Sequence, residues 1–143
     1  MSSPRTPTLA ADVIIELIDR PGRPIVLIER RNPPLGWAIP GGFVDVGEAV
    51  PAAAVREAAE ETGLQVTLTQ LLGCYSNPAR DVRGHTASIV YVAHASGIPR
   101  AMDDARDVAV FTLDQLPNPL AFDHADILRD YQRWRATGVL PAP

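Results

Sequence analysis

The stretch from Gly42 to Gly63 carries four glutamates and one arginine at fixed intervals. On a helix of about 3.6 residues per turn, Glu57, Glu60 and Glu61 fall within about 100° of one another. The roughly opposite side carries small residues, namely Ala52, Val55, Ala58, Ala59 and Thr62. This spacing predicts a helix that buries its small-residue side and gathers three carboxylates on the other.

Crowded carboxylates repel one another unless a cation neutralises them. Oxygen ligands suit Mg²⁺ or Mn²⁺, and Mg²⁺ commonly works with phosphate substrates. The alternative is an ordinary solvated helix decorated with glutamates, which explains neither the flanking glycines nor the intervals. The segment therefore predicts a metal site for phosphate chemistry.

The same residues carry a resemblance to a known family. The chain is similar to Nudix hydrolases, whose signature is G-x5-E-x7-R-E-u-x-E-E-x-G-u with u apolar, over residues 42–64. The fixed positions are filled by Gly42, Glu48, Arg56, Glu57, Glu60, Glu61 and Gly63. Ala58 is smaller than the aliphatic residue often found there. The resemblance implies a Nudix-type α/β/α sandwich, with a mixed β-sheet between helices.

Length and composition fit one compact enzyme domain. A chain of 143 residues predicts a single domain over residues 1–143. The net charge of −4 and the absence of a basic run disfavour a nucleic-acid polymer as partner. The lone cysteine, Cys74, is expected to pack within a strand, and it favours a reducing cytoplasm. No apolar run predicts a membrane segment, and a homodimer is left open.

Apolar runs separated by turn residues predict the order of elements. Strands are expected over 12–18, 24–29, 64–75, 86–95 and 108–113, and the first two form a hairpin. One helix should begin near Val50 and stop at Gly63, and a second should cover 122–137. Strands on both sides of a helix favour a mixed sheet between helices.

The resemblance also implies roles for individual residues. Glu57 and Glu61 are expected as direct metal ligands, and Glu60 as a direct or water-mediated one. The carbonyl of Gly41 is the expected backbone ligand, since a glycine lets the main chain approach a metal. Glu48 and Arg56 are expected to form a supporting ion pair that holds the loop against the helix.

The general base is expected in the acidic loop between Arg100 and Asp107. Many Nudix relatives use a carboxylate from a later loop to deprotonate water or to complete the metal site. Asp104 is the first candidate and Asp103 the second, and solvated loop aspartates are the alternative.

A looser resemblance concerns the substrate. Residues 75–85 and 122–128 are similar to segments of small bacterial and archaeal ADP-ribose pyrophosphatases. Candidate substrate-binding residues are Arg30, Tyr75, Arg80 and Arg83, because arginines suit diphosphate oxygens and a tyrosine can pack on a base or ribose. Arginine–aspartate pairs that pin a turn are the alternative. Three scattered histidines do not predict a zinc site.

These observations predict a Mg²⁺-dependent hydrolase of a nucleoside diphosphate linked to another moiety. The resemblance implies that ADP-ribose is cleaved to AMP and ribose 5-phosphate by attack of water on phosphorus. The alternatives are a nucleoside or dihydroneopterin triphosphate pyrophosphohydrolase and a non-catalytic ADP-ribose-binding protein. A binding regulator is disfavoured because 143 residues leave little room for a DNA-binding module.

Overall fold

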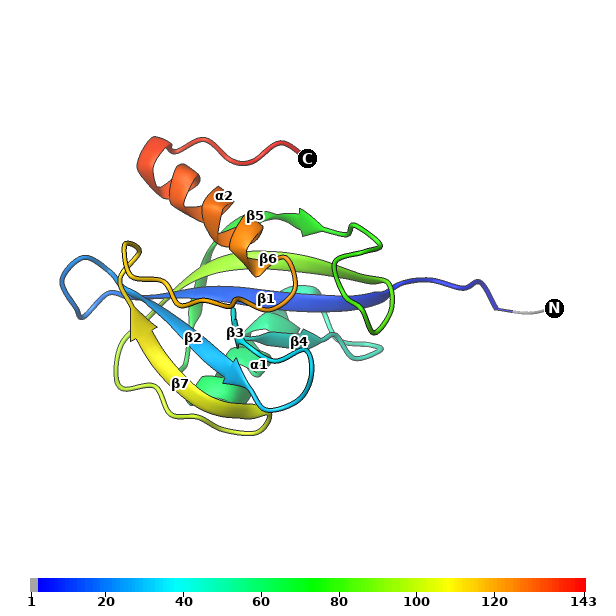
Figure 1. Cartoon of the computed structure of the whole chain (residues 1–143), viewed down its shortest axis with the longest axis horizontal. Coiled ribbons are helices and arrows are strands. Elements are labelled where there is room, and N and C mark those ends of the chain that lie inside the picture. The colour runs from blue at the N-terminus through cyan, green and yellow to red at the C-terminus, as the bar shows by residue number, and fades with distance from the viewer. Residues whose placement is uncertain (1–2) are drawn as a thin grey trace.

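A seven-stranded mixed sheet forms the centre of the computed structural model, which describes residues 3–143 (Figure 1). The strand order is β3-β2-β1-β6-β5, with β4 paired to β1 and β7 paired to β2. Strand β1 runs parallel to β6, and the other pairs are antiparallel. The elements are β1 (Thr8–Leu17), β2 (Ile25–Arg30), β3 (Trp37–Ala38), β4 (Gly41–Phe43), α1 (Val50–Thr62), β5 (Thr67–Tyr75), β6 (Thr86–Ala95), β7 (Ala105–Phe111) and α2 (His124–Thr137).

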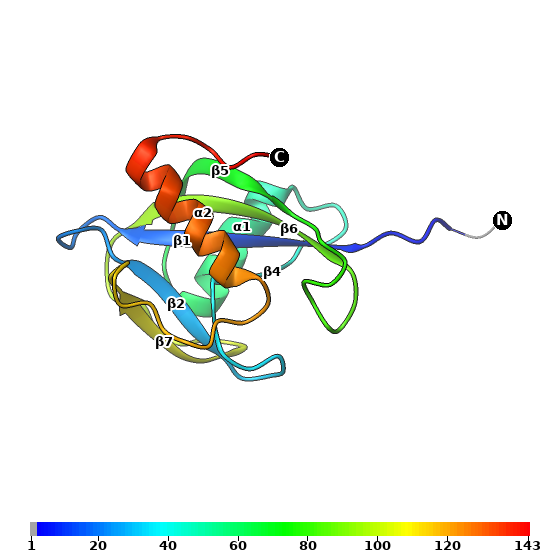
Figure 2. The same ribbon diagram turned by 45° about the horizontal axis from the view of Figure 1, so that its top comes forward.

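The two helices cover opposite faces of the sheet, as the turned view shows (Figure 2). Side chains of a strand alternate between faces, and β1 uses this alternation fully. Its odd positions, from Ala11 to Leu17, pack with Ala53, Ala54 and Ala58 of α1. The predicted α/β/α sandwich with a mixed sheet is therefore confirmed.

The even positions of β1 face α2 and are partly polar. Ile14 packs in a cluster with Ile127 and Leu128. On the same face the buried Glu16 accepts a hydrogen bond from the Tyr131 hydroxyl at 2.5 Å. A buried carboxylate is costly without partners, and this bond joins the middle of α2 to the sheet.

Helix α1 has the predicted bounds. Pro51 occupies its first turn, and Gly63 ends it with φ of 73°, a left-handed conformation that glycine adopts freely. The predicted buried side was wrong in part, because Ala52 is exposed while Ala53 and Ala54 are buried. Glu61 is buried as well, because it lies on the same side of the helix as Ala54 and Ala58.

Several strand bounds differ from the prediction. Strand β1 begins four residues early at Thr8, because all ten of its residues pair with β6. Strands β3 and β4 were not predicted, since pairs or triplets of residues carry no periodic pattern. Cys74 lies in β5 as predicted but is exposed rather than packed. No helix within residues 3–143 is long and apolar enough to cross a membrane.

The attachment of α2 can be tested with Tyr131→Phe. The change removes the donor to Glu16 and leaves a buried carboxylate oxygen with fewer partners, so the free energy of unfolding should fall by about 1–3 kcal/mol. Urea unfolding measures the effect. Tyr91→Phe is the matched control, because Tyr91 is half-buried on β6 and its loss should change stability little. Equal stability of both variants would show that the Tyr131–Glu16 hydrogen bond does not stabilise the attachment of α2.

Candidate active site

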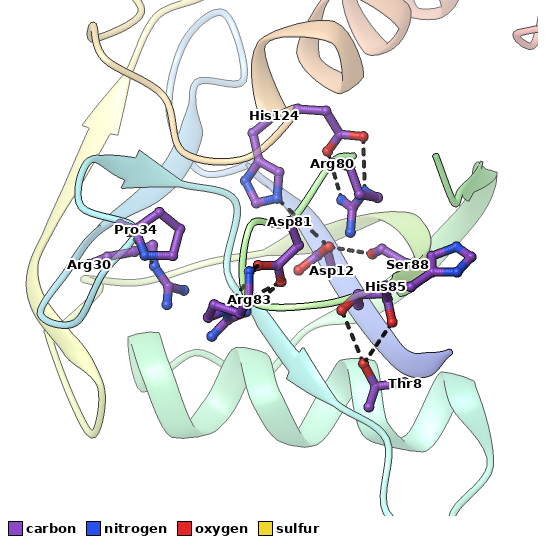
Figure 3. A network of polar contacts seen from close by, with 12 residues as sticks. Thr8, Asp12, Arg30, Pro34, Arg80, Asp81, Arg83, His85, Ser88 and His124 are labelled. Atoms are coloured by element: carbon purple, nitrogen blue, oxygen red, sulfur yellow. Dashed lines mark hydrogen bonds and ion pairs between the residues drawn. The ribbon is translucent and has the colours of Figure 1, made fainter. Parts of the chain in front are cut away.

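A cavity of about 320 Å³ opens where β1, β2, β4 and α1 meet the start of α2. Acidic and basic side chains line it together. The acidic ones are Asp12, Asp45, Glu57, Glu61, Asp81 and Asp104, and the basic ones are Arg30, Arg80 and Arg83. Figure 3 shows part of this polar network, viewed toward β1 and the loop between β5 and β6.

The backbone of Gly41 and Gly42 forms the floor beside α1. A Cβ atom on Gly42 would come within 3.0 Å of the Glu57 carboxylate, and one on Gly41 would meet Asp12 equally closely. At Gly41 the backbone of Ala11 and Asp12 leaves no room for a side chain, whereas at Gly42 a side chain would displace the Glu57 carboxylate. The Gly41 N–H donates to Oε1 of Glu61 at 2.7 Å. The predicted backbone ligand, Gly41, therefore lies beside the predicted metal-binding carboxylates of Glu57 and Glu61.

Burial changes the acidity of these carboxylates. Desolvation, opposed by the Gly41 hydrogen bond and assisted by the neighbouring Glu57 and Asp12, raises the pKa of Glu61 to about 8. Desolvation also raises the pKa of Glu57, against a hydrogen bond from Arg56. A bound cation would stabilise the ionised form of these desolvated carboxylates and so lower their pKa values.

The predicted ion pair between Glu48 and Arg56 is present. The Arg56 Nε and Nη2 atoms donate to the two Glu48 oxygens at 2.7 and 2.8 Å, and these bonds lower the pKa of Glu48 to about 2. Nη1 also donates to Glu57 at 2.9 Å and to Glu60 at 3.2 Å. Arg56 thus joins the loop after β4 to α1. Glu60 contacts Arg56 and does not line the cavity.

Sequence reasoning missed a buried network centred on Asp12, beside Gly41. Asp12 accepts a very short hydrogen bond from Ser88 Oγ, and burial raises its pKa to about 6. His124 Nε2 lies 3.9 Å from Asp12 (Figure 3). His124 Nδ1 accepts the Ile39 N–H at 3.0 Å, and burial lowers its pKa to about 3. The ring is therefore neutral, and its contact with Asp12 is dipolar.

Two of the predicted arginines face the cavity beside an aromatic ring. The guanidinium carbons of Arg30 and Arg83 lie 4.9 and 5.3 Å from the centroid of Phe122. Phe122 has a φ of 54°, which is uncommon for a residue with a side chain. Arg30 donates to the Pro34 carbonyl at 2.8 Å, and Arg83 forms a two-point pair with Asp81.

The other two predicted substrate residues are placed differently. Arg80 lines the cavity, but it is almost fully buried and donates to both carboxylate oxygens of Asp123 at 2.7 and 2.9 Å. Tyr75 is outside the cavity lining, and its hydroxyl donates to Asp130 of α2 at 2.7 Å. Both contacts attach the β5–β6 region to α2.

The two candidate bases are separated as well. Asp104 lines the cavity, whereas Asp103 does not. Asp103 has a φ of 50° and lies in the turn before β7. The backbone carbonyl of Asp104 accepts the Arg31 N–H at 3.3 Å, which holds this turn against the end of β2.

Comparison with known proteins agrees with this geometry. The profile of the NUDIX domain matches residues 7–131. The chain belongs to the Nudix family.

Similar proteins within the family have related names. An "ADP-ribose pyrophosphatase" of Methanocaldococcus jannaschii is 48% identical over 90% of this chain and 75% of its own. An "ADPR responsive transcriptional repressor NtrR" of Acinetobacter baylyi is 32% identical, and the match covers 87% of this chain but only 52% of the repressor. The NUDIX domain of Shewanella oneidensis NrtR, solved with ADP ribose, has a TM-score of 0.79 at 29% identity, covering 93% of this chain and 90% of that one.

Nudix hydrolases generally use a divalent metal ion, and the residues here fit one. Among residues 3–143 no group of three or more His, Cys, Asp or Glu side chains is arranged to hold a metal by itself. Glu57 and Glu61 supply two carboxylates beside the Gly41–Gly42 backbone. Hard cations such as Mg²⁺ are commonly held by one or two carboxylates together with water and substrate phosphates. The oxygen-rich floor suits this kind of shared site.

The raised pKa of Glu61 predicts how stability depends on pH without metal. Its folded pKa of about 8 exceeds the ordinary glutamate pKa of 4.5, so the native state of this Nudix domain binds more protons than the unfolded state between these values. Stability should therefore fall as pH rises from 6.5 to 8, by at most about 1.4 kcal/mol per unit. The pKa of His124 is about 3 when folded and ordinarily 6.5, so its opposing contribution is half lost at pH 6.5 and vanishes about one pH unit higher.

Urea unfolding in a chelator at several pH values measures this slope. Glu61→Gln should flatten it, because glutamine does not titrate. Added divalent cation should restore stability most strongly near pH 8, where the carboxylate is ionised. A slope that is unchanged by Glu61→Gln would show that another group is responsible.

Proposed function

We propose that this chain is a Mg²⁺-dependent pyrophosphohydrolase that cleaves ADP-ribose to AMP and ribose 5-phosphate, with Mn²⁺ as a substitute metal. The proposal takes residues 1–143 as one catalytic domain. The observation that carries it is a single cavity in which Glu57 and Glu61 adjoin the Gly41–Gly42 backbone and face Arg30 and Arg83. The similarity to a named ADP-ribose pyrophosphatase supports the choice of substrate.

The acidic and basic walls suit different parts of one ligand. When bound, Mg²⁺ would neutralise charge on the phosphoryl oxygens and help to orient the diphosphate. Glu57 and Glu61, with the Gly41 carbonyl, would hold it. Arg30 and Arg83 would donate to diphosphate oxygens from the other side, because guanidinium groups match phosphate geometry.

Hydrolysis forms one bond from a water oxygen to phosphorus and breaks one phosphoanhydride P–O bond. The water must lose a proton, and we assign its acceptance to Asp104, whose side chain lines the cavity. The leaving phosphate is AMP or ribose 5-phosphate, depending on which phosphorus is attacked. Arg80, buried against Asp123, would act by holding the β5–β6 loop in place.

Two other functions remain alternatives. A triphosphate pyrophosphohydrolase would release pyrophosphate. A non-catalytic ADP-ribose-binding protein is favoured by the similarity to the ADPR-responsive repressor. Against the non-catalytic alternative, every fixed position of the Nudix signature on α1 carries its expected residue, including Glu57, Glu60 and Glu61. The cytoplasmic location and a homodimer remain predictions.

A substrate panel with Mg²⁺, resolved by product chromatography, tests the proposal. ADP-ribose should give AMP and ribose 5-phosphate in equal amounts. Pyrophosphate from a nucleoside or dihydroneopterin triphosphate, without cleavage of ADP-ribose, would support the first alternative. Tight binding of ADP-ribose without products would support the second.

The close approach at the glycine pair gives a sharp mutational test. In Gly42→Ala the new methyl group would overlap the Glu57 carboxylate, and the flexible side chain would move away rather than the backbone. Turnover of ADP-ribose should fall by at least about 10²-fold, as for the loss of a charge that stabilises the transition state.

Gly73→Ala is the matched control for this test. A Cβ atom there has its nearest neighbour at 3.6 Å, which is ordinary contact. It should retain wild-type turnover. Circular dichroism should show both variants folded, and near-wild-type turnover in Gly42→Ala would remove Glu57 from its assigned position.

The base assignment is tested with neighbouring aspartates. Asp104→Asn should lower kcat by about 10²- to 10⁴-fold and leave KM nearly unchanged, because proton acceptance belongs to the transition state. Asp103→Asn, in the same turn but off the cavity, is the control and should change neither constant. If both variants behave alike, the loop has a structural role and Asp104 is not the base.

A further inference from the structure

A second cavity, of about 690 Å³, lies beside the catalytic one. The segment before and at the start of β1 forms one wall, through Arg5, Thr6 and Thr8. The end of the β5–β6 loop forms another, through His85 and Thr86 (Figure 3 labels Thr8 and His85). None of Arg5, Thr6 and His85 lines the catalytic cavity.

The two cavities share a boundary. Phe43, Asp81, Arg83 and Thr86 line both. Arg83 is held there by its pair with Asp81, and its guanidinium carbon lies 5.8 Å from the Phe43 centroid and 5.3 Å from that of Phe122. A ligand whose diphosphate lies beside Arg83 can therefore extend into either cavity.

The polar groups in the lining of the second cavity are of kinds that recognise hydroxyls. The hydroxyl groups of Thr8 and Thr86 are hydrogen-bonded to each other at 3.0 Å. A hydroxyl group can both donate and accept a hydrogen bond. His85 Nε2 lies 2.9 Å from the Ser76 carbonyl, which only accepts, so Nε2 carries the proton. In the neutral form of an imidazole with a proton on Nε2, Nδ1 is an acceptor.

Arg5 adds a donor that is free for a ligand. Its side chain is exposed and makes no ion pair within the part of the chain that the structure describes, residues 3–143. A guanidinium offers five N–H donors and no acceptor. Together with the threonine hydroxyls and the His85 acceptor, it provides the mixed donors and acceptors that a polyhydroxylated sugar requires.

The catalytic cavity offers a different surface. There the guanidinium groups of Arg30 and Arg83 both lie over the Phe122 ring, and flat rings and guanidinium planes suit a nucleobase by stacking. Arg5, Thr8 and His85 thus lie on one side of Arg83 and Phe122 on the other, while Phe43 lies at the boundary between the two cavities.

We propose that the second cavity is the subsite for the terminal sugar of the substrate, the pentose attached to the phosphate distal to the nucleoside. This assignment rests on the proposed function, since it divides one substrate of the form nucleoside–diphosphate–sugar between two cavities. Arg5, Thr6 and His85 are its specificity-determining residues.

Direct binding of the two products tests the subsite without relying on turnover. Calorimetric titration of the full chain with AMP and, separately, with ribose 5-phosphate, both with Mg²⁺, gives two dissociation constants. Arg5→Ala should weaken binding of ribose 5-phosphate by about 5-fold, the factor expected for one lost hydrogen bond. Arg5→Glu should weaken it further, and AMP should bind both variants as it binds the wild type.

Arg129→Ala is the matched control, because Arg129 is an exposed arginine on α2 that lines neither cavity. It should leave both dissociation constants unchanged. Because Arg5 is exposed, its variants should remain folded, and circular dichroism checks this.

The remaining outcomes separate the two proposals. Weaker AMP binding in the Arg5 variants would place the nucleoside in the second cavity and overturn the assignment. Unchanged binding of both products, or no binding of ribose 5-phosphate to the wild type, would also overturn it. If ribose 5-phosphate binds in an Arg5-dependent way but ADP-ribose is not cleaved, the sugar subsite stands and the proposed hydrolysis fails.

Discussion

The candidate site depends on the close approach of two glycines to buried carboxylates. A Cβ atom at Gly41 would overlap the backbone of Ala11 and Asp12, and one at Gly42 would displace the carboxylate of Glu57. The Gly41 N–H also holds Glu61 in the interior. Strand β4 is only three residues long, yet through this contact it fixes β1 and α1 relative to each other. The resulting crowding of negative charge is relieved in part by hydrogen bonds and, in our proposal, by a metal ion.

Strand β1 extends this arrangement across the sheet. Its odd positions pack on α1, while its even positions place Asp12 and Glu16 beneath α2. Glu16 accepts a hydrogen bond from Tyr131 in the middle of α2, and Asp12 lies near His124 at its start. Because both carboxylates are buried, the helix is held at two polar points as well as by its apolar contacts. The start of α2 is thereby positioned as a wall of the catalytic cavity.

The sequence was most informative where chemistry and local periodicity coincide. Helix α1, its glycine cap and the Glu48–Arg56 pair follow from spacing within one segment. Asp12, Ser88 and His124 could not be found that way, because they are distant in sequence and meet only through sheet pairing and helix packing. The Arg80–Asp123 pair is likewise a contact across 43 residues. An acidic residue within the otherwise apolar β1 was the one available signal for Asp12, and it became interpretable only once both faces of the sheet were known to be covered.

The cavity presents opposite charges on its two sides, and this limits what it can bind well. Glu57 and Glu61 repel a bare diphosphate, while Arg30 and Arg83 repel a bare cation; burial and the nearby Arg83 already lower the pKa of Arg30. A ligand that combines a diphosphate with a divalent cation satisfies both walls at once. Each component would therefore bind better in the presence of the other, because each screens the charges that oppose its partner. In the proposed function, that mutual requirement makes the cation part of substrate recognition as well as of hydrolysis.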